Sequence, residues 1–143
     1  ARLQKTFDLA PNFWMPHIFA SSVYTEKGMY AEAVAEARKA KELSPYQTVS
    51  EGFGGYALAR SGKSDEARVM LGELLKLSET RFVPANHIAL IYNGLGETDK
   101  TFEWLEKAFE QHDPKVSFLK VEPKWNNLRS DPRFIEMLKR LQF

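Results

Sequence analysis

The chain has 143 residues, the length of a single domain, and its 43% hydrophobic and 13% aromatic content is enough to build a core. Its 20 basic and 19 acidic side chains leave a formal charge of +1, so no strong overall field attracts nucleic acid or a membrane surface. The absence of cysteine excludes disulfides, thiolate metal sites and a cysteine nucleophile.

An internal repeat is visible at three glycines, because Gly28, Gly62 and Gly96 recur at equal intervals along the chain. Other positions keep the same spacing relative to these glycines. Four residues upstream stand Tyr24, Leu58 and Tyr92, and twelve residues downstream stand Ala40, Leu74 and Ala108. Several columns that agree at one period indicate a repeat architecture.

Each period predicts two amphipathic helices joined at the glycine, because apolar residues recur at helical spacing on either side of it. In chain order, the predicted helices are 14–27, 31–43, 48–61, 64–78, 82–94 and 98–111. Glycine suits the left-handed backbone that closes a helix. Ser64 and Thr98 are predicted to cap the helices that follow.

The two ends of the chain carry different signals. Residues 1–10 are expected to be the end of a helix from a preceding repeat, so the chain is expected to begin inside a longer protein. Residues 115–143 are expected to form a linker and a capping helix, with Asp131 as N-cap and Pro132 in the first helical position. An apolar stripe would let this helix cover the end of the stack, and its members are Phe134, Met137, Leu138 and Leu141.

A helix pair that repeats at this period, with these columns, resembles the tetratricopeptide repeat family over residues 11–114. The resemblance implies an all-α, right-handed superhelical solenoid of three units, about 14–47, 48–81 and 82–115. The first unit matches best, through Tyr24, Gly28, Tyr30, Ala33, Ala37, Ala40 and Pro45, whereas His17, Glu51 and Ala85 replace the usual tryptophan. The C-terminal string from Pro123 to Phe134 resembles the tail of bacterial proteins in which such repeats follow a winged-helix, kinase or adenylate-cyclase domain.

The resemblance also implies a non-catalytic scaffold that binds a peptide or a partner helix on a concave groove lined by the first helices of each unit. The expected groove residues are Met15, Phe19, Phe53, Tyr56, Arg60, Asn86, His87, Leu90 and Asn93, with Ile18, Ser22, Val49 and Val83 beside them. Family members that bind chaperone tails clamp a terminal carboxylate with Lys and Asn, which the corresponding slots here lack. Whether Phe53 and Tyr56 belong to the groove or to the core is left open by the sequence.

An alternative interpretation is a regulatory input or self-association domain of a larger bacterial signalling protein, whose partner is its own upstream domains or another copy.

Catalytic, cofactor and metal sites are not expected. Gly62–Lys63–Ser64 lacks the earlier glycine of a phosphate loop, and His17, His87 and His112 lie in different units without ligand spacing. Residues 114–143 are basic but carry no nucleic-acid recognition pattern. No apolar run is long enough for membrane insertion. The sequence leaves the compartment open between cytoplasm and periplasm, with the cytoplasm slightly favoured.

Overall fold

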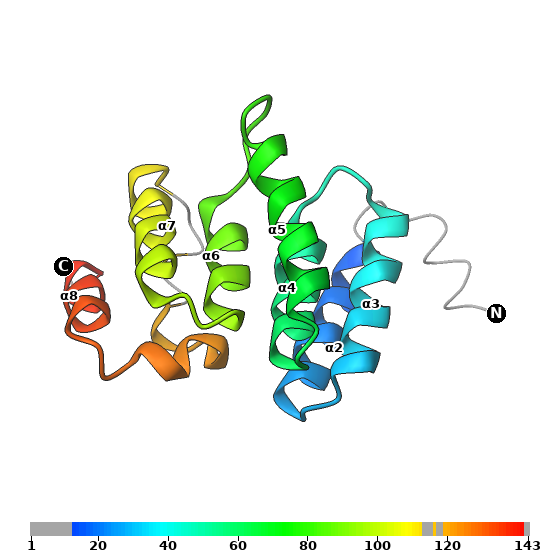
Figure 1. The fold of residues 1–143 in the computed structure, drawn as a ribbon, viewed down its shortest axis with the longest axis horizontal. Helices are drawn as coiled ribbons and strands as arrows, with labels where there is room; N and C mark the ends of the chain where they lie inside the picture. Colours follow the sequence, from blue (N-terminus) through cyan, green and yellow to red (C-terminus); the bar gives the residue numbers. More distant parts are fainter. Residues whose placement is uncertain (1–12, 113–115, 117–118, 142–143) are drawn as a thin grey trace.

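The computed structural model describes residues 13–112, 116 and 119–141, and within these residues all regular secondary structure is helical. Six helices follow one another through the main body of the chain (Figure 1). They are α2 (Trp14–Glu26), α3 (Tyr30–Leu43), α4 (Val49–Arg60), α5 (Ser64–Leu77), α6 (Ala85–Gly94) and α7 (Thr98–Glu110). The expected all-α fold of helix pairs is therefore confirmed, whereas the segment 1–10 lies outside the described residues.

The helix pairs turn at the three periodic glycines. Gly28, Gly62 and Gly96 have φ values of 75°, 88° and 78°, in the left-handed region that side chains disfavour, as the repeat predicted. Each pair packs closely along its length, and α4 also packs against both α3 and α6. The first helices of the pairs, α2, α4 and α6, therefore lie next to one another in the stack.

Two details of the predicted helix starts are wrong. Ser64 and Thr98 are the first residues of α5 and α7 rather than N-caps, and neither helix has a side-chain cap. The chain enters α5 directly from the glycine turn, so that Lys63 takes the N-cap position with its backbone N–H bonded to the carbonyl of Leu58. Helix α6 begins at Ala85 instead of 82, because Pro84 has an extended backbone with ψ of 125°.

Close contact between α4 and α6 depends on glycine. A Cβ atom added at Gly55 would lie 2.7 Å from Cγ1 of the fully buried Ile91, and one at Gly52 would lie 3.2 Å from Cα of His87. A side chain at either position would force the two helices apart. The glycines of α4 therefore determine how closely α4 and α6 approach each other.

The chain continues after α7 into a 3-10 helix, η2 (Pro123–Leu128), and a last helix, α8 (Pro132–Arg140). Asp131 caps α8 as predicted, because its side chain accepts a hydrogen bond of 2.8 Å from the Arg133 backbone N–H. We refer to residues 119–128, which precede this cap, as the strap.

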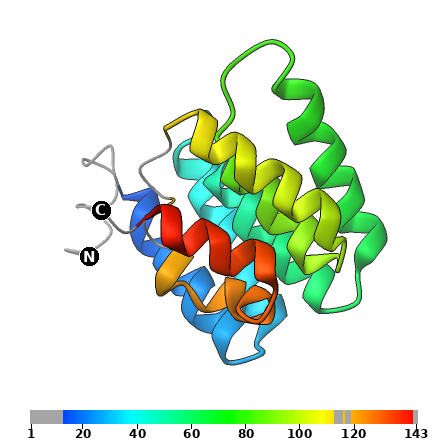
Figure 2. The same ribbon diagram turned by 90° about the vertical axis from the view of Figure 1, so that its left-hand side faces the viewer.

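Helix α8 packs alongside α7, and Figure 2 shows the two helices next to each other. Two ion pairs join them, from Arg133 to Asp99 at 2.8 Å and from Arg140 to Glu106 at 2.5 Å, and the sequence separation is the same in both pairs. The helices therefore run in the same direction. The stripe predicted for this helix faces the core, with Phe134 and Met137 buried and Leu138 and Leu141 packed beside them.

Candidate functional site

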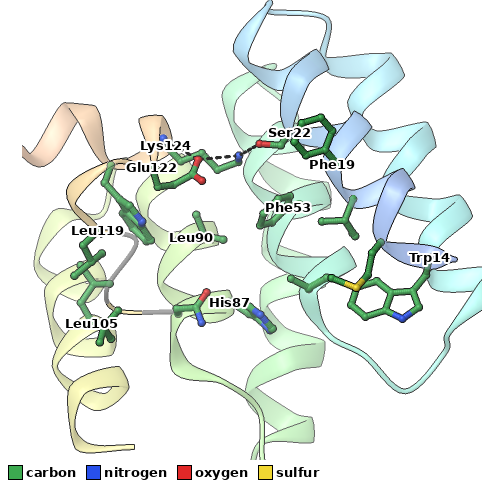
Figure 3. A pocket seen from close by; sticks show the side chains of 16 residues that line it. Trp14, Phe19, Ser22, Phe53, His87, Leu90, Leu105, Leu119, Glu122 and Lys124 are labelled. Atoms are coloured by element: carbon green, nitrogen blue, oxygen red, sulfur yellow. Dashed lines mark hydrogen bonds and ion pairs between the residues drawn. The ribbon is translucent and has the colours of Figure 1, made fainter. Parts of the chain in front are cut away.

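A pocket of about 480 Å³ lies between α2, α4 and α6 on one side and the strap on the other (Figure 3). Most of its lining is apolar. From the helices come Trp14, Met15, Ile18, Phe19, Ser22, Val49, Phe53, Asn86, His87, Leu90 and Leu105, and from the C-terminal segment Val116, Leu119, Glu122, Lys124 and Trp125. The pocket therefore combines residues from both ends of the described chain.

Six of the nine expected groove residues lie together in this lining: Met15, Phe19, Phe53, Asn86, His87 and Leu90. The additional residues Ile18, Ser22 and Val49 also line it, whereas Val83 does not. The remaining three expected residues, Tyr56, Arg60 and Asn93, lie outside the lining. Arg60 is exposed at the end of α4.

The pocket has an exposed rim and a buried floor. On α2, Phe19 is 73% exposed and Met15 is 52% exposed. On α6, Leu90 is only 3% exposed, and Phe53 of α4 is partly buried. A ligand that enters past the α2 rim would therefore meet apolar side chains at every depth.

Tyr56 and Asn93 lie beneath the strap and hold its backbone. The Asn93 side-chain amide donates a hydrogen bond of 2.8 Å to the Lys124 carbonyl, and the Tyr56 hydroxyl donates a longer one of 3.5 Å to the same oxygen. Asn93 also exchanges side-chain hydrogen bonds with Asn127. Burial raises the pKa of the Tyr56 hydroxyl. The structure therefore places Phe53 in the pocket wall and Tyr56 in the core under the strap.

Lys124 closes one end of the pocket. Its side chain is 1% exposed, and its Nζ atom donates hydrogen bonds of 2.7 Å to Ser22 Oγ and 3.2 Å to Glu122 Oε1. The same ammonium lies 4.4 Å from the centre of the Phe53 ring, within the range of a cation–π interaction. A charge so deeply buried requires such partners, because transfer of an unpaired ammonium from water is costly.

The three histidines occupy separate environments. His17 pairs with Glu36 at 2.6 Å, His87 shares a hydrogen bond of 2.7 Å with the Thr48 hydroxyl, and His112 is exposed just after α7. Among the described residues, no group of three His, Asp or Glu side chains is placed to hold a metal ion. The structure thus leaves the three histidines in different parts of the fold.

Sequence reasoning missed the strap as part of the site. The sequence predicts a linker for Leu119, Glu122 and Lys124 and a packing role at a helix junction for Trp125, whereas all four line the pocket. The amino-acid composition of this segment could have indicated its burial. Large apolar residues such as Leu119, Trp125 and Leu128 are not expected in a linker that is exposed to solvent. All three are buried to 4% exposure or less.

These features define a stack of paired helices with an apolar pocket on its inner side. In comparisons with known proteins, the family model of the tetratricopeptide repeat matches residues 17–47, which include most of α2 and all of α3. No curated protein and no solved structure matches the chain. Repeats of this family generally mediate protein–protein interactions and are typically non-catalytic. No helix within the described residues has the length and apolar character needed to cross a membrane.

Proposed function

We propose that this protein is a non-catalytic interaction module that holds a short segment of a partner protein in the pocket between α2, α4, α6 and the strap. The observation that supports this most directly is the gathering of Phe19, Phe53 and Leu90 from three successive inner helices around one pocket. A few residues carry most of the binding energy in protein interfaces, and aromatic side chains supply large contact areas there.

The strap indicates how a backbone can be held on this side of the molecule. The side-chain amide of Asn93 donates a hydrogen bond to the backbone carbonyl of Lys124. An extended peptide bound in a groove presents backbone carbonyls that can accept hydrogen bonds in the same way. Because the strap occupies the part of the inner surface near Asn93 and Tyr56, a partner segment is left with the part near Phe19, Phe53 and Asn86.

A matched pair of exposed phenylalanines tests this function. Phe19 is 73% exposed at the pocket rim, and Phe82 is 63% exposed between α5 and α6 and does not line the pocket. Peptides selected from a random phage-displayed library against the intact chain would be measured by fluorescence polarisation against Phe19→Ala and Phe82→Ala. We expect Phe19→Ala to weaken binding about tenfold or more, and Phe82→Ala to leave it unchanged.

Neither substitution should alter folding, because both side chains are largely exposed. Melting curves of the two variants provide that control. A library that yields no binder, or binders that respond equally to both substitutions, would contradict the proposed function.

A second candidate function is self-association or regulation within a larger protein. The observation that favours it is that the inner surface already holds a segment of the same chain through Asn93 and Ser22. Sedimentation velocity over a range of concentrations tests self-association. Growth of a dimer that Phe19→Ala abolishes would support it, and a monomer at all concentrations would argue against it.

A further inference from the structure

We propose that the pocket accepts an uncharged apolar group of the partner, such as a large aliphatic or aromatic side chain, and discriminates against groups of either charge. This inference rests on the proposed function and specifies the chemistry of the same site. The supporting observation is that the two charged side chains in the pocket wall pair with each other.

Among the described residues that line the pocket, the Lys and Asp/Glu side chains are Lys124 and Glu122. The Nζ atom of Lys124 lies 3.2 Å from Oε1 of Glu122. The Lys124 ammonium has three N–H groups. Two of them are directed to Ser22 Oγ and Glu122 Oε1, and the ammonium also lies against the ring of Phe53. Glu122 Oε1 further accepts the backbone N–H of Lys124 at 3.3 Å. The pair is therefore neutralised within the wall.

An entering charge would lose its hydration without gaining a new counterion. A carboxylate would have to compete with Glu122 for Lys124. An ammonium that approached Glu122, whose side chain is 27% exposed, would lie close to the Lys124 ammonium and be repelled by it. Lys124 is 1% exposed, so the loss of Glu122 as its partner would leave a buried ammonium uncompensated, which is strongly unfavourable. A neutral group leaves the pair intact.

The floor and far wall favour an apolar occupant. Leu90, Leu105, Leu119 and Trp125 are each buried to 4% exposure or less, and each lines the pocket. Removal of apolar surface from water is the main favourable term for a group that enters such a site. The volume of about 480 Å³ lies in the range of pockets that enclose small organic groups, roughly 300–1,000 Å³.

The test uses small probes that isolate the buried group from the rest of a partner. The uncharged fluorophore N-phenyl-1-naphthylamine reports binding to the intact chain by its increase in emission. Octan-1-ol, octanoate and octylammonium then compete with it at pH 7, because they share one alkyl chain and differ in charge. We expect octan-1-ol to displace the probe at a concentration at least tenfold lower than either ion.

Two sets of variants show whether the pocket and its ion pair are responsible. Val49→Trp places a large side chain in the lining and should abolish probe binding, whereas Val69→Trp on the exposed face of α5 should not. Glu122→Gln keeps an acceptor for Lys124 but removes the negative charge. It should therefore lower the octanoate concentration needed for displacement at least fivefold relative to octan-1-ol.

Failure of this inference and failure of the proposed function give different results. Equal displacement by all three competitors, no fluorescence increase, or an unchanged octanoate preference in Glu122→Gln would overturn the inference even if selected peptides bind at Phe19. If both ions displaced the probe less well than octan-1-ol but Phe19→Ala left peptide affinity unchanged, the inference about the pocket would hold. The proposed role of the pocket in partner binding would then be wrong.

Discussion

The Nζ atom of Lys124 lies 2.7 Å from Oγ of Ser22, a residue 102 positions earlier in the chain. This contact joins the strap to α2, across the inner surface from α6, which the strap contacts through Asn93. The pocket is therefore bounded by residues brought together from the first described helix and the last third of the chain. Its shape depends on contacts of the strap as much as on the helix stack.

Removal of the Ser22 hydroxyl should destabilise the fold through the strap. A hydrogen bond to a charged group contributes about 1.5–3 kcal/mol, and Lys124 is too deeply buried to recruit water easily. We expect Ser22→Ala to lower the free energy of unfolding by about that amount in urea titrations. Ser61→Ala, which removes a hydroxyl bonded locally to the Leu58 carbonyl, serves as the control. If the two alanine variants were equally stable, the strap contact would be unimportant.

Phe53 and Tyr56 should respond differently to truncation. Tyr56 is buried and packs with Leu90 and Trp125, so Tyr56→Ala should cost about 3–5 kcal/mol of unfolding free energy. Phe53 is partly buried in the pocket wall, and Phe53→Ala should cost clearly less. Chemical denaturation of both variants measures the difference. An equal loss would place Phe53 in the core as firmly as Tyr56.

Two glycine-to-alanine substitutions should change stability in opposite directions. The new Cβ in Gly55→Ala would lie 2.7 Å from Cγ1 of Ile91, and we expect a loss of about 1–3 kcal/mol. No neighbouring atom lies within 4 Å of a Cβ at Gly72 in α5, so Gly72→Ala should gain up to about 1 kcal/mol from helix propensity. Thermal melts followed by circular dichroism compare the two. Stabilisation by Gly55→Ala would show that α4 and α6 can move apart without penalty.

Helix α8 should be needed for stability. Phe134 is fully buried against α7, and Phe134→Ala should cost about 3–5 kcal/mol. Its neighbour Ile135 is 43% exposed, and Ile135→Ala should cost about 1 kcal/mol or less. Removal of residues 131–143 should have a larger effect than Phe134→Ala and should cause aggregation, measured by light scattering. A stable, monomeric truncated chain would show that α8 is dispensable.

The cap of α8 predicts a dependence of stability on pH. Hydrogen bonds from Arg133 hold the pKa of the Asp131 carboxyl below its usual value. A carboxyl whose folded pKa is lowered stabilises the fold above its unfolded pKa, and this contribution disappears as the pH falls through the folded pKa. Asp131→Asn keeps a capping oxygen but removes the charge. We expect the wild-type chain to melt higher than this variant at pH 6, and the two melting temperatures to converge towards pH 2.

The helix pairs could be predicted from sequence because the repeat period and the local apolar spacing can both be read directly along the chain. Gly28, Gly62 and Gly96 fix the turns by their backbone alone. The position of the strap depends instead on contacts such as Lys124 with Ser22, which no local pattern encodes. For the same reason the sequence placed Asn93 in an open groove, whereas the structure shows it bonded to the strap. The start of α6 was misplaced because apolar spacing extended past Pro84.

The ion pairs between α7 and α8 each join residues one repeat period apart in the sequence. Helix α8 stands one repeat period after the first part of α7, and the strap stands one repeat period after α6. Ser130 holds the place that Gly96 holds one period earlier. The C-terminal part therefore has the spacing of one further unit, with the 3-10 helix η2 at the position of its first helix and α8 at the position of its second. The strap wall of the pocket therefore occupies the sequence position that the first helix of a fourth unit would take.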